Sequence, residues 1–137
     1  MVITVTLNPA IDKTLKVRNF SIGEVNRSNA IRYDIGGKGV NVSKVLKNLN
    51  IESTCIGFVG GMWEDTFLKE LSKRGIATKF THISGEMRTN TKIVDEINGT
   101  FTDLNEEGPE ISRDVLNIFL KEFAEGLSKS DIVVLTS

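Results

Sequence analysis

A change of hydrophobic period at residues 36–39 constrains the fold of this chain more than any other feature of its sequence. Residues 24–35 carry apolar side chains at alternate positions, which is typical of a strand with one buried face. Residues 40–49 instead carry them at helical spacing. The segment between them holds three glycines in four residues. A strand joined to a helix by glycines indicates an α/β fold in which the backbone of the joint can approach a ligand closely.

The other strand patterns are of two kinds. Continuous apolar runs, which suit strands covered on both faces of a parallel sheet, occupy residues 2–7, 53–59 and 132–135. Alternating patterns, which suit strands with one solvated face, occupy residues 13–19, 24–35, 89–97 and 100–104. Asn98-Gly99 predicts a two-residue hairpin turn between the last two of these.

Helices are predicted after the glycine joint, at residues 63–74, and after Pro109. Gly75 is the expected end of the second helix. Ser112 is the expected N-cap of the third. The expected apolar stripe of this third helix consists of Leu116, Phe119, Phe123 and Leu127.

Length and composition restrict the class of protein. The chain is long enough for one domain, residues 1–137. Lys and Arg number 17 and Asp and Glu 18, and this net charge of −1 argues against nucleic-acid binding. Single Cys and His residues, Cys55 and His82, exclude an internal disulfide and a Cys-cluster or multi-histidine metal site. The sequence has no apolar run of about 20 residues, as a membrane span requires, and it does not begin with a positively charged signal peptide. We therefore expect a cytoplasmic protein with no membrane partner.

The glycine joint is also the strongest candidate for a ligand site. Gly36, Gly37 and Gly39 let the backbone approach a ligand, and the helix N-terminus that follows offers unpaired N–H groups. Lys38 adds a full positive charge, and Asn41 adds an amide that both donates and accepts. The spacing matches neither a P-loop nor a dinucleotide fingerprint. The structural alternative is a glycine-rich turn with a solvated lysine.

Two more candidates lie near predicted strand ends. Asp12 follows the strand at residues 2–7, at the carboxyl end where open α/β sheets place ligand contacts. A carboxylate there can accept hydrogen bonds from two sugar hydroxyls. Arg88 and Asn90 stand at the start of the strand at residues 89–97, and a planar guanidinium suits phosphate. The structural alternatives are a local turn bond for Asp12 and a surface arginine for Arg88.

These segments together resemble the ribokinase-like (PfkB) family of carbohydrate kinases. The family signature of a Gly pair, a small residue and Asn appears at residues 36–43, and Gly60 closes it. Asn50 departs from the signature, which usually has Gly or Ser there, but Asn is the next-best residue for a left-handed helix end. The closer resemblance, to members that phosphorylate fructose 1-phosphate or tagatose 6-phosphate, rests on residues 6–12, 23–27, 88–92, 102–105 and 108–109.

The resemblance implies a ribokinase-like three-layer α/β sandwich with a small β-strand lid, of which this chain is the N-terminal portion only. The lid strands would lie at about residues 13–35 and 89–104 and would pair with the lid of a second copy in a homodimer. Asp12 would bind sugar hydroxyls, and Lys38 and Arg88 would bind the phosphate of the substrate. The full set of implied substrate-binding residues is Asp12, Gly36, Gly37, Lys38, Asn41, Arg88 and Asn90.

The implied activity of the complete enzyme is transfer of a phosphoryl group from ATP, with Mg²⁺, to fructose 1-phosphate, which gives fructose 1,6-bisphosphate. Tagatose-6-phosphate kinase is the first alternative. The resemblance also places the catalytic Asp base and most of the ATP pocket in a later half, so we expect no catalytic residue, no metal ligands and no turnover from this chain alone. A non-catalytic sugar-phosphate-binding or dimerising fragment is the second alternative. A nucleotide-binding oxidoreductase is the third, disfavoured by the missing dinucleotide fingerprint.

Overall fold

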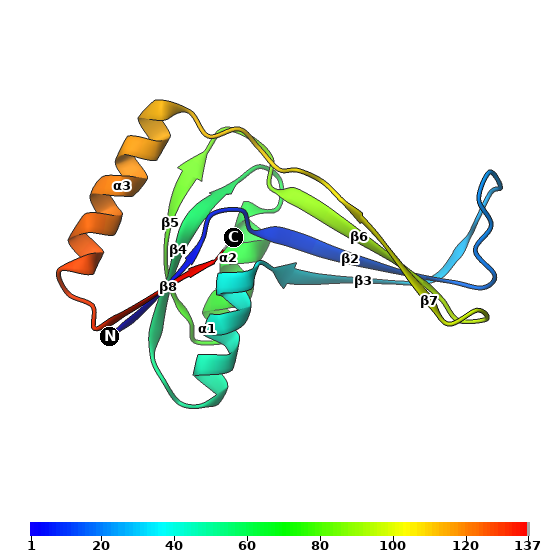
Figure 1. Ribbon diagram of the computed structural model, residues 1–137, viewed down its shortest axis with the longest axis horizontal. Helices are drawn as coiled ribbons and strands as arrows, with labels where there is room; N and C mark the ends of the chain where they lie inside the picture. The colour runs from blue at the N-terminus through cyan, green and yellow to red at the C-terminus, as the bar shows by residue number, and fades with distance from the viewer. Residues whose placement is uncertain (137) are drawn as a thin grey trace.

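The computed structural model describes residues 1–136, which form two β-sheets and three helices (Figure 1). Sheet A contains β1 (Val2–Thr6), β4 (Ser53–Gly60), β5 (Ala77–Ile83) and β8 (Ile132–Thr136). Sheet B contains β2 (Ala10–Val17), β3 (Ser28–Gly36), β6 (Arg88–Asp95) and β7 (Thr100–Asn105). The helices are α1 (Lys38–Asn48), α2 (Glu64–Lys73) and α3 (Arg113–Leu127).

Sheet A is parallel, with the strand order β5-β4-β1-β8. Its inner strand β1 pairs on both sides, and Val5 is in register with Ile56 of β4 and Leu135 of β8. The last four residues of β1 are buried. The strand predicted at residues 2–7, apolar on both alternations, is therefore covered on both faces, as a parallel sheet between helices requires.

Helices cover both faces of sheet A (Figure 1). On one face, Val40 of α1 and Phe67 of α2 pack with Val59 of β4, and none of the three is more than 1% exposed. On the other face, Phe119 of α3 packs against Phe58 of β4 with ring centroids 4.8 Å apart. The predicted three-layer α/β sandwich is confirmed.

Sheet B extends away from sheet A and the helices, with the strand order β3-β2-β6-β7 (Figure 1). Strand β2 begins at Ala10, three residues before the predicted start, because Ala10 and Ile11 are buried in the core at 1% exposure. Asp12, predicted to follow the carboxyl end of the strand at residues 2–7, therefore lies within β2. The strand predicted at 24–35 also begins too early, because Asn26 closes a loop by hydrogen bonds to the backbone N and O of Ser21.

The hairpin predicted at Asn98-Gly99 is present, but its turn has four residues, 96–99, rather than two. The cause is Asp95, whose buried carboxylate accepts hydrogen bonds from the backbone N–H groups of Ile97 and Asn98 and from the Asn98 amide. It also accepts from the backbone N–H groups of Asn19 and Phe20 in the β2–β3 loop. These donors, the Asn98 amide foremost, hold the pKa of Asp95 well below its usual range. One carboxylate thus ties the two loops at the tip of sheet B together.

Helix α3 begins as predicted. The Ser112 side chain accepts a hydrogen bond from Val115 N at 3.3 Å. The predicted apolar stripe is too wide, because Leu116 and Leu127 are 40% and 44% exposed whereas Val115 packs into the core with Phe119. Within residues 1–136, no helix is both long and apolar enough to span a membrane.

Candidate active site

The glycine joint between β3 and α1 lies against the carboxyl end of β1. Gly37 is the N-cap of α1 and has φ +120°, a region that strongly favours glycine. A Cβ at Gly37 would stand 2.6 Å from Cγ2 of Thr6 and 3.3 Å from Cα of Pro9. The first turn of α1 contains no acidic residue, so its positive dipole end is not neutralised there. The backbone of the glycine joint therefore lies in close contact with Thr6 and Pro9.

One face of sheet B carries two rows of polar side chains that cross all four strands. In the first row, Asp12 is in register with Asp34 and Asn90, and Asn90 is in register with Asn105. The second row lies two residues from the first on every strand and consists of Arg32, Thr14, Lys92 and Asp103. Because side chains alternate between the faces of a strand, both rows lie on the same face. The eight residues line an open concavity of about 270 Å³.

Asp12 stands where this concavity meets the glycine joint. Its carboxylate packs against Gly36 so closely that any Cβ at Gly36 would overlap it. Partial burial raises the pKa of Asp12, and the positive charges of Lys44 and Arg88 oppose that rise. The carboxylate thus lies in a partly desolvated position with cations nearby, where hydrogen bonds to it are stronger than in water.

Arg88 and Asn90 each contain a buried polar atom without a partner. In residues 1–136, the buried side-chain nitrogen and oxygen atoms that lack a hydrogen-bond partner are Arg88 Nε and Asn90 Oδ1. Arg88 Nη2 donates to the backbone oxygen of Asn8 at 3.1 Å, so the side chain is anchored at its other end. Unpaired buried polar groups are costly and rare in proteins, so this pair of atoms marks a place where a ligand can supply the missing partners.

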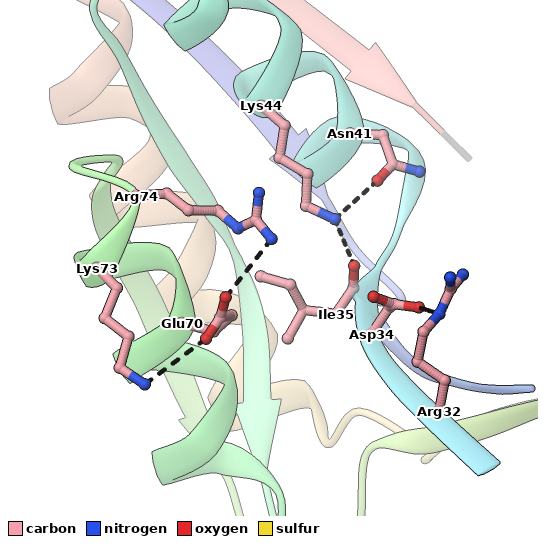
Figure 2. A network of polar contacts seen from close by, with 8 residues as sticks. All are labelled: Arg32, Asp34, Ile35, Asn41, Lys44, Glu70, Lys73 and Arg74. Atoms are coloured by element: carbon pink, nitrogen blue, oxygen red, sulfur yellow. Dashed lines mark hydrogen bonds and ion pairs between the residues drawn. The ribbon is translucent and has the colours of Figure 1, made fainter. Parts of the chain in front are cut away.

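The remaining predicted residues lie on α1. Lys38 is its first residue and is exposed. Asn41 is one turn further on, and its carbonyl oxygen accepts a hydrogen bond from Lys44 Nζ at 3.2 Å (Figure 2). Figure 2 also shows the amide nitrogen of Asn41 pointing away from Lys44.

The structure brings four of the seven predicted site residues to one face of sheet B. Gly36 and Arg88 flank Ala10 in register, and Asp12 and Asn90 form the next pair along the strands. The other three, Gly37, Lys38 and Asn41, follow directly in the joint and the first turn of α1.

Sequence reasoning missed the other residues of the concavity and one lysine beside it. These residues are Thr14, Arg32, Asp34, Lys44, Lys92, Asp103 and Asn105. The one signal in the sequence was the alternation within residues 88–92 and 102–105, which places Lys92 on the same face as Asn90. That signal does not reveal which strands are neighbours.

Comparisons with known proteins agree with this arrangement. The family model described as pfkB family carbohydrate kinase matches residues 2–137. The chain is 38% identical over 135 residues to a 1-phosphofructokinase of Bacillus subtilis and 35% identical over 136 residues to that of Borreliella burgdorferi. These matches cover 98% and 99% of this chain but 43% of each relative. The chain thus spans less than half the length of the curated relatives that it matches.

Solved structures show the same fold. A possible 1-phosphofructokinase from Thermotoga maritima superposes with a TM-score of 0.89 at 39% identity, over 100% of this chain and 44% of that one. Phosphofructokinase-2 from Escherichia coli, in a tetrameric inhibited form, superposes with a TM-score of 0.88 at 20% identity. This match covers 99% of this chain and 44% of that one. The second likeness, at that identity, concerns the fold alone. With its signature glycines, its two sheets and a family match over nearly its whole length, the chain belongs to the pfkB family of carbohydrate kinases.

Proposed function

We propose that this chain carries the sugar-phosphate site of a kinase that, when complete, converts fructose 1-phosphate to fructose 1,6-bisphosphate. The observation that carries the proposal is the pair of unpartnered buried atoms, Arg88 Nε and Asn90 Oδ1, beside Asp12. One of these atoms donates and the other accepts, as a ligand with both phosphate oxygens and hydroxyl groups requires. Relatives at 35–38% identity that are 1-phosphofructokinases support this substrate over tagatose 6-phosphate.

Each predicted residue has a role suited to its chemistry. Asp12 accepts hydrogen bonds from sugar hydroxyls, and Gly36 leaves the space that its carboxylate occupies. Gly37 and Asn41 hold the sugar through backbone and amide contacts. Lys38 and Arg88 hold the phosphate already present on the substrate, because charge-assisted hydrogen bonds are the strong ones. Asn90 orients the sugar between Asp12, which binds its hydroxyl groups, and Arg88, which binds its phosphate.

For the complete kinase we propose ATP as the phosphoryl donor and Mg²⁺ as its metal. In residues 1–136, no group of three His, Cys, Asp or Glu side chains is placed to hold a metal ion. The phosphoryl-transfer step is not assigned to these residues. We expect the 137-residue chain to bind sugar phosphate without transferring a phosphoryl group.

Isothermal titration of the purified chain with fructose 1-phosphate tests the proposal. We expect saturable binding at one site per chain, and weaker binding of tagatose 6-phosphate, because relatives at 35–38% identity are 1-phosphofructokinases. ADP release with Mg-ATP, measured in parallel, is expected to be absent. Absence of binding would contradict the proposed site, and turnover would show that these residues include the catalytic base.

We further propose that sheet B pairs with sheet B of a second copy. The face opposite the concavity carries Ile31 and Tyr33 of β3 and Leu104 of β7, which are 55%, 49% and 58% exposed. Ile31 and Tyr33 lie on one edge strand and Leu104 on the other, and exposed apolar patches are typical of interaction surfaces. Sedimentation velocity is expected to show a concentration-dependent dimer that weakens in Ile31→Glu. A strictly monomeric wild-type protein would contradict this pairing.

A further inference from the structure

Lys44 of α1 makes two hydrogen bonds at the edge of the proposed site. Its ammonium nitrogen donates to the backbone oxygen of Ile35 at 2.5 Å and to Asn41 Oδ1 at 3.2 Å (Figure 2). Ile35 immediately precedes the glycine joint. One side chain therefore links the end of β3, the start of the joint and the first turn of α1.

The contact with Lys44 determines which way the Asn41 amide faces. An ammonium group has three donors and no acceptor, so only the carbonyl end of the amide can face it. The amide nitrogen then points away from Lys44, as Figure 2 shows. Asn41 is exposed, so this nitrogen is a donor accessible to a ligand oxygen. A reversed amide would offer a carbonyl there instead and would repel a phosphate or carboxylate.

The charges around Lys44 connect it to the rest of the site. Partial burial lowers the pKa of Lys44, and so does the positive charge of Arg74. Asp34, Asp12 and Glu70 oppose that lowering. Glu70 also pairs with Arg74 at 3.5 Å, which partly balances the positive charge of Arg74 (Figure 2). The same ammonium favours the charged form of Asp12, so Lys44 supports two of the proposed sugar contacts at once.

We propose that Lys44 is a positioning residue of the sugar-phosphate site, which holds Asn41 with its amide nitrogen toward the sugar and anchors the strand end before the glycine joint. This inference rests on the proposed function for the identity of the ligand. Lys44 itself need not touch the substrate, because it acts through Asn41 and through the backbone of Ile35.

Titration with fructose 1-phosphate of the 137-residue chain and its variants tests the role. Lys44→Met is expected to weaken binding about tenfold, because the Asn41 amide loses its orientation and with it a hydrogen bond to the ligand, and Lys44→Arg is expected to retain most of the affinity. Lys47→Met is the matched control, because Lys47 lies on the same helix and pairs with Glu52 at 2.8 Å, away from the joint. Binding by the Lys47 variant is expected to match wild type.

A double-mutant cycle separates positioning from general damage. If Lys44 acts mainly through Asn41, Lys44→Met is expected to weaken binding much less in an Asn41→Ala background than in the wild-type chain. Equal losses in both backgrounds would overturn the proposal, because they would show that Lys44 acts independently of Asn41.

A readout without ligand distinguishes failure of this inference from failure of the proposed function. The side-chain amide resonances of Asn41 are expected to shift in Lys44→Met and to stay in place in Lys47→Met, with Asn41→Ala providing the assignment. Unchanged Asn41 resonances in Lys44→Met would overturn the positioning role. If these resonances shift but no protein, wild type included, binds fructose 1-phosphate, the positioning of Asn41 stands and the proposed substrate is wrong.

Discussion

Replacing Phe67 with alanine is expected to lower the free energy of unfolding by about 3–5 kcal/mol. The Phe67 side chain has no exposed surface and packs edge-on against Phe80, with ring centroids 5.5 Å apart and an interplanar angle of 88°. It lies on α2 in the core between the helices and sheet A. Its removal would lose the transfer free energy of the ring and leave a cavity that close-packed neighbours fill only in part.

Urea unfolding followed by circular dichroism measures this loss. Leu68→Ala is the matched control, because Leu68 is the next residue of α2 and is only partly buried against the same core. A smaller loss is expected for Leu68→Ala. If Phe67→Ala lost no more stability than this control, the core arrangement around α2 would be wrong.

Replacing Arg88 with alanine is expected to weaken binding of fructose 1-phosphate by about 10–150-fold, which corresponds to about 1.5–3 kcal/mol for a charged hydrogen bond. The guanidinium is anchored to the backbone oxygen of Asn8, and its Nε is buried without a partner. A phosphate oxygen would supply that partner. Isothermal titration measures the loss, and urea unfolding shows whether the variant keeps its fold.

Two further variants make the Arg88 result specific. Arg88→Lys keeps the charge but not the planar fork, so we expect it to recover only part of the affinity. Arg113→Ala removes an exposed arginine at the start of α3, far along the chain from the site residues, and is expected to bind as wild type does. Unchanged affinity in Arg88→Ala would show that the phosphate is held elsewhere.

Local patterns predicted most of the secondary structure. The continuous apolar run at residues 2–7 and the alternation at 24–35 are properties of adjacent residues, and each predicted a strand. Only the first is of the expected kind, because the apolar side chains Ile31 and Tyr33 of β3 are 55% and 49% exposed rather than buried. Asn50 adopts φ +59° after α1, as its place at a helix end predicts. Errors arose where a distant contact prevailed, as at Asp95, whose carboxylate holds both a hairpin and a loop and widens the predicted turn.

The candidate site also contains one part that the sequence predicted and one part that it did not. The glycine joint was visible in the sequence because three glycines in four residues at a strand–helix junction indicate a backbone that other groups approach closely. The strand position of Asp12 and the row that it forms with Asp34 and Asn90 were not visible, because register depends on pairing between strands far apart in the chain.

The sequence by itself therefore determined the order of strands and helices, the glycine joint and the residue types that can hold a sugar phosphate. Only the tertiary structure decided which side chains share a face of sheet B and which polar atoms of Arg88 and Asn90 stay unpartnered. The physical reason is the separation along the chain of the residues that each interaction joins. Period and turn chemistry act between neighbouring residues, whereas strand register and burial exist only after distant segments pack together.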